Sequence, residues 1–302
     1  MGFEEKIVDS AFITIGMPIA LIIIMMGLGF EVTVKDFRRV KDNPKNVLIA
    51  LFCQLVLLIS IAFGLIHLFD LQPLLAVGLM ILAASPGGSS ANLFSYLFKG
   101  DIALNITLTA FNSVIAAFTL PIVATLSIQY FMQDNTVIAV QLDKLIQVFA
   151  LILLPLITGM FIRAKKPIFA HKIEKFTKYF SVLFLVTVCI GALLKERANV
   201  IEYFSQVGWI CALFCAISLS VGYWIPKLFN MREAEARACA FEIGIHNSAV
   251  ALTIAISVLG STTVAIPAAV YSVIMIIFAF TLGAVFKLKD RKLLIQQNMS
   301  YK

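Results

Sequence analysis

Three polar residues lie close together in an otherwise apolar stretch of the chain, FEIGIHNSAV (241–250): Glu242, His246 and Asn247. A charged side chain inside a membrane costs at least about 2.5–3.5 kcal/mol on insertion scales, which makes such a residue a functional candidate by default. The Glu242 carboxylate could supply the negative charge that one or two cations need. His246 follows four positions later, so on an unbroken helix the two side chains would share a face and could act as an acid and base pair.

The composition defines the environment of these residues. Of the 302 residues, 61% are hydrophobic and only 14% are charged, against about a quarter charged in soluble domains. Runs of about 20 apolar residues can cross a bilayer as helices, and they are too long for the strands of a membrane barrel. We therefore expect an all-α polytopic protein of the plasma (inner) membrane, with residues 1–302 in a single domain. Nine spans are expected near residues 12–32, 46–69, 72–98, 102–132, 137–162, 179–194, 205–226, 238–259 and 263–286.

Lysine and arginine are distributed unevenly over the expected loops. Twenty of the 24 lie in alternate segments, 33–45, 99–101, 163–178, 227–237 and 287–302, and only four lie on the opposite side. Positively charged loops face the cytoplasm. This pattern predicts nine spans with the N-terminus outside and the C-terminus in the cytoplasm. The net charge of +7 is thus explained by topology, and we expect no nucleic acid partner.

Two of the expected spans are interrupted. In ILAASPGGSSANLFSYLF (81–98), the sequence Pro86-Gly87-Gly88 removes a backbone donor and disfavours helix, so the span should unwind there. The second interruption is the polar stretch at 242–247. Interrupted spans in corresponding positions of two halves indicate a transporter binding site made from an inverted repeat. The repeats are expected at about 12–132 and 137–286. The free N–H groups that begin a half-helix favour an anion, such as a carboxylate.

Three stretches resemble the bile acid:sodium symporter family: IMMGLGFEVTVKDFRRV (24–40), SPGGSSANLFSYLFKGDIALNITLTA (85–110) and FEIGIHNSAVA (241–251). The resemblance covers almost the whole chain. It implies a core domain in which two discontinuous helices cross at mid-membrane, together with a panel domain. The chain resembles a nine-span form that lacks the first span of ten. The resemblance also implies that Ser89 and Asn247 contact the substrate, and it gives no reason to expect more than a monomer.

The resemblance further implies two sodium sites that share Glu242. In the first, Asn92 and Thr109 match the family's ligands as they stand. Ala91 and Asn105 replace expected serines; Asn105 can still offer a carbonyl oxygen, whereas Ala91 offers no side-chain ligand. Other roles remain open for these residues, because Glu242 could be protonated or paired with a polar neighbour and Thr109 could bond back to its own helix.

The second implied site consists of the side chains of Gln54 and Glu242, the main-chain carbonyls of Ile243 and Ile245, and His246. His246 stands where a glutamine is usual, although a hard cation should favour oxygen over imidazole nitrogen. Three interpretations are open: a neutral hydrogen-bond partner, an altered or lost sodium site, or proton linkage. Gln54 could also serve only as a hydrogen-bond partner between helices.

These features favour a symporter that couples inward sodium movement, of one or two ions, to uptake of an organic anion, either bile acid-like or a small carboxylate. The alternative is a proton-coupled or sodium-independent organic anion carrier of the same fold. A membrane enzyme is disfavoured because the sequence has no HExxH or GxSxG motif. A receptor or structural membrane protein would not require two interrupted spans.

Overall fold

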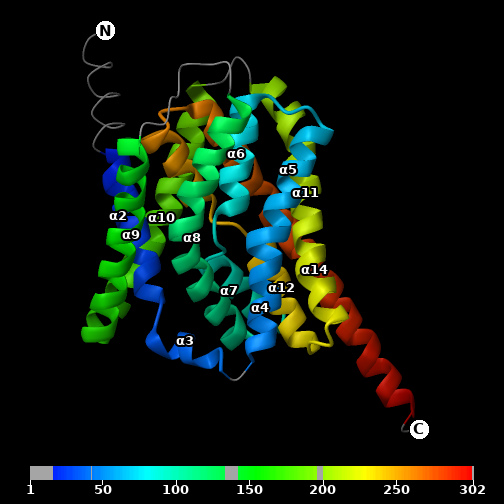
Figure 1. The fold of residues 1–302 in the computed structure, drawn as a ribbon. Helices are drawn as coiled ribbons and strands as arrows, with labels where there is room; N and C mark the ends of the chain where they lie inside the picture. Colours follow the sequence, from blue (N-terminus) through cyan, green and yellow to red (C-terminus); the bar gives the residue numbers. More distant parts are fainter. Residues whose placement is uncertain (1–15, 42, 133–141, 196–199, 301–302) are drawn as a thin grey trace.

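The chain is helical throughout the part that the computed structural model describes, residues 16–41, 43–132, 142–195 and 200–300 (Figure 1). No strand occurs among these residues. Within them, five helices are long and apolar enough to cross a membrane: Pro44–Leu68, Ile102–Phe131, Ser205–Leu228, Glu233–Val258 and Thr262–Leu293. The prediction of an all-α membrane protein is therefore confirmed for the described residues.

The helices follow the apolar runs of the sequence, and a short polar helix, α3, separates the first two runs. Two of the helical elements, η2 and η4, are single π-helical turns inside longer helices. In chain order the elements are α2 (Met17–Glu31), α3 (Val34–Arg39), α4 (Pro44–Phe52), η2 (Cys53–Leu57), α5 (Leu58–Leu68), α6 (Pro73–Ala84), α7 (Ser89–Leu97), α8 (Ile102–Phe131), α9 (Leu142–Lys165), α10 (Pro167–Lys195), α11 (Val200–Leu228), α12 (Glu233–Gly244), α13 (Ser248–Thr253), η4 (Ile254–Val258) and α14 (Thr262–Ser300).

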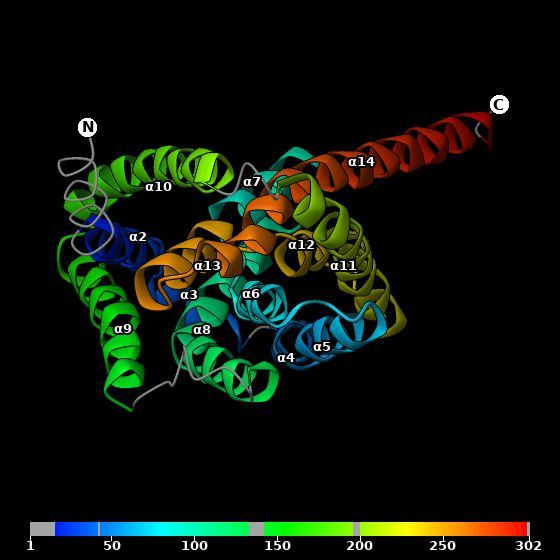
Figure 2. The same cartoon turned by 90° about the horizontal axis from the view of Figure 1, so that it is seen from above.

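Helices α2, α9 and α10 pack against one another on one side of the molecule (Figure 2). Glycines bring α2 and α9 close together. A Cβ atom added to Gly29 would overlap the carbonyl oxygen of Leu156, and one added to Gly159 would overlap that of Met26. Small residues allow such close approach where no hydrophobic driving force acts between helices in lipid.

The remaining long helices form a second group around α12 and α13. In the segment Glu233–Val258, 94% of the most apolar window is buried inside the protein, more than in any other of the five long apolar helices. Helices α6 and α14 pack beside it, and a Cβ atom on Gly78 would overlap the carbonyl oxygen of Val264. The polar residues of the 241–250 stretch therefore lie at the centre of this group and not on its outer surface.

Both interruptions expected from the sequence are present. Helix α6 ends at Ala84 and α7 begins at Ser89, while α12 ends at Gly244 and α13 begins at Ser248. In Figure 1, α6 occupies the upper half of the molecule and α7 the lower half. The two breaks touch, because the Asn247 N–H donates to the Pro86 carbonyl over 2.8 Å. The Tyr271 hydroxyl donates to the Gly244 carbonyl over 2.8 Å, which gives a partner to one of the carbonyls that a helix end leaves free.

Some boundaries differ from those expected. Helix α10 begins at Pro167 and not near 179, because Pro167 suits the first turn of a helix and the lysines that follow form a solvated face. Helix α14 continues past 286 to Ser300. The expected starts of the first and fifth spans, at 12–15 and 137–141, lie outside the described residues.

Candidate functional site

The Glu242 carboxylate lies at the point where the two breaks meet α8. The residue is 0% exposed. Its Oε2 accepts a hydrogen bond from Thr109 Oγ1 over 2.6 Å, and its Oε1 accepts one from Asn112 Nδ2 over 3.1 Å. The carboxylate also lies directly against Gly87 of the first break, where an added Cβ would come within 2.6 Å of Oε1. Hydrogen bonds and close packing thus fix the position of this acidic group.

Helix α8 contributes one polar face to the site. Asn105, Thr109 and Asn112 are spaced by four and three residues, which places them on the same side of a helix. Asn105 uses its amide nitrogen for other contacts: Nδ2 donates to Ser95 Oγ over 2.6 Å and to the Ala238 carbonyl over 3.0 Å. Asn105 therefore ties α8 to α7 and α12. Its Oδ1 lies 3.5 Å from the Thr109 hydroxyl, so this oxygen has only a weak partner.

Besides Asn105 Oδ1 at 3.5 Å, Thr109 has two closer acceptors for its single hydroxyl proton. The Glu242 Oε2 lies at 2.6 Å and the Asn105 carbonyl, one helical turn earlier, at 3.0 Å. The bond to the Glu242 carboxyl group is the shorter of the two, and a bond to an ionised carboxylate is about twice as strong as one between neutral groups. A simple back-bond to its own helix therefore does not account for Thr109.

Asn112 is a residue of the site that was not predicted from the sequence. It is 2% exposed, and its Nδ2 donates to Glu242, while its Oδ1 has no hydrogen-bond partner in the part of the chain that the structure describes. The spacing of three residues after Thr109 was the signal that could have identified it, because positions i and i+3 face the same side of a helix. Asn112 is thus an additional candidate ligand.

Three buried oxygen atoms near the breaks have no hydrogen-bond partner among the described residues: Asn92 Oδ1 on α7, Asn112 Oδ1 on α8 and Gln54 Oε1 on η2. A buried polar atom without a partner costs about 1–3 kcal/mol. Oxygen atoms of carboxylates, amides and carbonyls are the ligands that hard cations prefer. The residue types around Glu242 therefore suit a sodium ion.

Gln54 and His246 meet at a single carbonyl. Gln54 Nε2 donates to the Ser85 carbonyl over 3.3 Å, and His246 Nδ1 lies 3.1 Å from the same oxygen. Gln54 is located in the π-helical turn η2, and such turns are frequent at functional sites. Ile243 lies in the last turn of α12 and Ile245 is its C-cap, where carbonyl groups lack helical partners.

Asn247 links the second break to the first. Its side chain accepts a hydrogen bond from the Val250 N–H over 3.2 Å and so caps α13, while its own N–H bonds to Pro86. Ser89 is the first residue of α7; its side chain lies outside the part that the structure describes. Both residues are therefore placed at helix starts, as expected.

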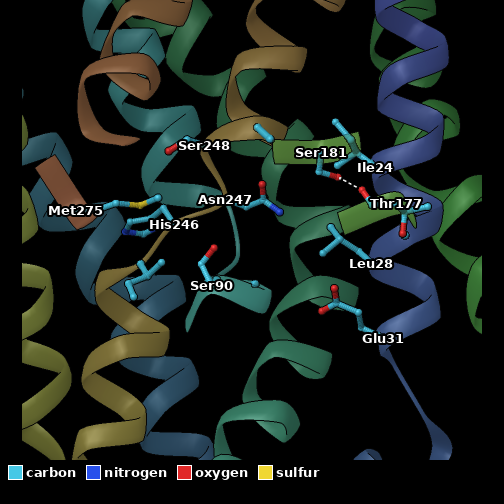
Figure 3. Close-up of a pocket in the computed structure, with 15 residues that line it drawn as sticks. Ile24, Leu28, Glu31, Ser90, Thr177, Ser181, His246, Asn247, Ser248 and Met275 are labelled. Carbon is cyan, nitrogen blue, oxygen red and sulfur yellow. Dashed lines mark hydrogen bonds between the residues drawn. The ribbon is translucent and has the colours of Figure 1, made fainter. Parts of the chain in front are cut away.

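A pocket of about 120 Å³ opens between the breaks and the group formed by α2 and α10. Figure 3 shows Asn247 pointing from the second break towards Leu28 and Ser181 on the opposite wall. Glu31 lines the lower part of this wall, and Ser90 lies across from it. His246 lies on the other side of the break, next to Met275.

The arrangement disfavours an acid and base pair of Glu242 and His246. Glu242 bonds to Thr109 and Asn112, and His246 bonds to Ser85. Among the described residues, no hydrogen bond joins Glu242 to His246. The same part of the chain contains no group of three or more His, Cys, Asp or Glu side chains that could hold a metal. The break at 245–247 explains this result, since the two residues no longer share one helical face.

Comparison with known proteins identifies relatives over most of the chain. The model of the Sodium Bile acid symporter family matches residues 18–203, which confirms the resemblance drawn from the sequence. A probable sodium/metabolite cotransporter of chloroplasts, BASS2 of Oryza sativa subsp. japonica, is 26% identical over 83% of this chain and 59% of its own. The uncharacterized sodium-dependent transporter YocS of Bacillus subtilis is 27% identical over 87% of this chain and 79% of its own.

The human ileal sodium/bile acid cotransporter is 24% identical over 81% of this chain and 70% of its own. The chain spans 59% of the length of BASS2 and 66% of another chloroplast relative, the probable sodium/metabolite cotransporter BASS1 of Arabidopsis thaliana, which is less than two thirds of each. BASS2 of Oryza sativa, YocS and the human ileal protein are each named as transporters or cotransporters. The family match agrees with the prediction of a membrane transporter, and none of these three names describes an enzyme.

Proposed function

Because this chain belongs to the Sodium Bile acid symporter family, we propose that it is a symporter that couples sodium entry to the uptake of an organic anion. The observation that carries this proposal is the fully buried Glu242 carboxylate, held by Thr109 and Asn112 against the first break. A buried negative charge among oxygen atoms without partners is stabilised by a bound cation. The names of the sodium-coupled relatives agree with this choice of ion.

The cation site is formed by Glu242 with Thr109, Asn112 and Asn92. Asn105 contributes a side-chain oxygen, Oδ1, that is only weakly bonded. The carboxylate neutralises the ion, and the amide oxygens replace part of its hydration shell. A bound cation also lowers the repulsion between Glu242 and an arriving anion. Sodium binding therefore favours substrate binding.

The substrate occupies the pocket between the breaks and α2 with α10. Ser89 begins α7, whose free N–H groups favour an anionic group, and Asn247 points into the pocket (Figure 3). The pocket of about 120 Å³ is smaller than the roughly 300–1,000 Å³ usual for drug-sized ligands. A small carboxylate suits this volume better than a bile acid does.

Transport proceeds by alternating access between two parts of a nine-span protein. We assign α2, α9 and α10 to a panel, and the remaining long helices to a core that contains both breaks. Helices α4 to α8 and α11 to α14 each contain one interrupted helix between two continuous ones, which supports an inverted repeat. The lysine and arginine distribution supports an external N-terminus and a cytoplasmic C-terminus.

Uptake by proteoliposomes tests this function. Radiolabelled small carboxylates are offered to the reconstituted protein under an inward sodium gradient, an inward proton gradient, or neither. We expect the wild type to accumulate the carboxylate under the sodium gradient, and not under the proton gradient or without a gradient. Glu242→Gln should lose this accumulation. The matched control is Asp70→Asn, at an exposed loop position where asparagine tolerates the left-handed backbone, φ 46°. Accumulation driven by protons, or equal uptake without any gradient, would assign the chain to the alternative class of carrier.

A further inference from the structure

The Ser85 carbonyl, in the first break, accepts hydrogen bonds from two different elements. Gln54 Nε2 approaches it from η2 at 3.3 Å, and His246 Nδ1 approaches it from the second break at 3.1 Å. A carbonyl oxygen can only accept, so His246 must carry its proton on Nδ1 in this arrangement. Two residues expected to bind the second sodium ion, Gln54 and His246, thus direct N–H groups at the Ser85 carbonyl.

Neighbouring rings hold the imidazole in this orientation. The ring of His246 stacks on Phe214, with centroids 5.5 Å apart and planes at 19°, and it meets Tyr271 edge-on at 5.4 Å. The residue is 2% exposed. A buried ring packed between two aromatic side chains cannot swing towards Glu242 without disrupting the core.

Histidine and glutamine differ in what they can offer at this position. A glutamine amide can turn either its oxygen or its nitrogen towards a partner, whereas an imidazole has no oxygen to offer. Rotation of the His246 ring would place carbon next to Ser85, and loss of the Nδ1 proton would bring two lone pairs together. Both changes are unfavourable.

The Gln54 oxygen does not compensate for this loss. Gln54 Oε1 and His246 Nε2 are both buried without a hydrogen-bond partner among the described residues. Nε2 is a nitrogen, which a hard cation binds less well than oxygen, and the N–H groups of both residues are directed at the Ser85 carbonyl. These donors carry positive partial charge and therefore oppose a cation. At the same time they hold η2 and the second break to the first break, as a cation bound between them would do.

We infer that this chain binds a single sodium ion, at Glu242, and that His246 closes the second cation position beside Gln54. The inference rests on the proposed function and fixes its coupling ratio. One sodium ion carried with a monovalent anion moves no net charge, whereas two sodium ions would move one positive charge. His246 is in this sense a residue that determines the stoichiometry of coupling.

The test measures the binding of sodium alone to the purified full chain in lipid nanodiscs. Equilibrium binding of ²²Na⁺ at saturation gives the number of ions per protein. We expect one ion for the wild type with a Hill coefficient near 1, and two ions for His246→Gln. Two ions in the wild type, or one ion in a folded His246→Gln protein, would overturn the inference.

A second variant makes the test independent of how well His246→Gln folds. Gln54→Ala removes the side-chain oxygen of the second position and should leave saturation at one ion with an unchanged midpoint. A fall in the number of bound ions, or a sodium midpoint shifted several-fold, would show that Gln54 is a ligand and would overturn the inference. Absence of sodium binding in the wild type would refute the proposed function itself, and this result differs from the two-ion result.

Discussion

Gly87 and Gly88 are adjacent glycines in the first break, yet substitution by alanine should affect sodium binding at only one of them. A Cβ atom on Gly87 would lie 2.6–2.8 Å from the Glu242 carboxyl atoms. A Cβ atom on Gly88 would meet only Asn247 Nδ2, at 3.7 Å, an ordinary contact distance. Gly88 has an extended backbone, φ 169°, which any residue can adopt. Gly88→Ala is therefore the matched control.

The size of the effect follows from the displacement. To reach an ordinary contact distance of at least 3.4 Å from 2.6 Å, the Glu242 carboxylate must move by about 0.8 Å. Moving a carboxylate from about 2.5 Å to about 3.3 Å from a cation loses about 1.6 kcal/mol at an effective dielectric constant of about 20. Each 1.4 kcal/mol is about tenfold in affinity, so sodium binding should weaken roughly 15-fold in Gly87→Ala.

The assay is a sodium titration of thermal stability at constant ionic strength, with choline chloride as the replacement salt. The midpoint of stabilisation should shift roughly 15-fold in Gly87→Ala and by less than about twofold in Gly88→Ala. Stability without sodium should also fall in Gly87→Ala, because the displaced carboxylate loses part of its bonds to Thr109 and Asn112; the midpoint of the sodium titration is therefore the quantity compared. Equal midpoints for the two variants would refute the placement of the cation at Glu242.

Two further predictions use matched pairs. Thr109→Val removes the hydroxyl that donates to Glu242. It should weaken sodium binding by roughly 10- to 150-fold, the equivalent of about 1.5–3 kcal/mol. The control, Thr125→Val, loses a bond to its own helix and should bind sodium like the wild type in the same titration. Arg237→Met leaves Asp290 without its buried partner and should lower the free energy of unfolding by about 3–5 kcal/mol. Lys99→Met removes the exposed cation, 75% accessible, that pairs with the same Asp290 carboxylate, and it should cost less than about 1 kcal/mol in the same denaturation experiment. Similar losses in the two variants would contradict a larger contribution from the buried Arg237.

The first break was predictable because its cause is local. Pro86 lacks an N–H group and Gly87 and Gly88 disfavour helix, so the chain unwinds there whatever surrounds it. Glu242 was predictable for a similar reason, since an acidic residue in an apolar run must have a partner. The second break has no such cause in its residue types. It depends on Asn247 as an N-cap, on its bond to Pro86 and on the Tyr271 hydroxyl, which come together only in the folded protein.

The parts of the site that were missed depend on tertiary packing. Asn112 continues the face defined by Asn105 and Thr109, but only the position of Glu242 shows that this face is used. The orientation of His246 is set by Phe214 and Tyr271, residues far away in the sequence. The sequence left three interpretations of His246 open, and its contact with Ser85 is the observation that supports our inference of a hydrogen-bond donor. That contact could not have been predicted from spacing.

The central claim is that sodium binds at the Glu242 carboxylate, and the most direct measurement compares the wild type with Glu242→Gln. The glutamine keeps the size of the side chain and removes its charge. Thermal stability is measured in sodium chloride and in potassium chloride at equal ionic strength. The account predicts stabilisation by sodium over potassium in the wild type and none in Glu242→Gln. An equal sodium effect in both proteins would contradict it.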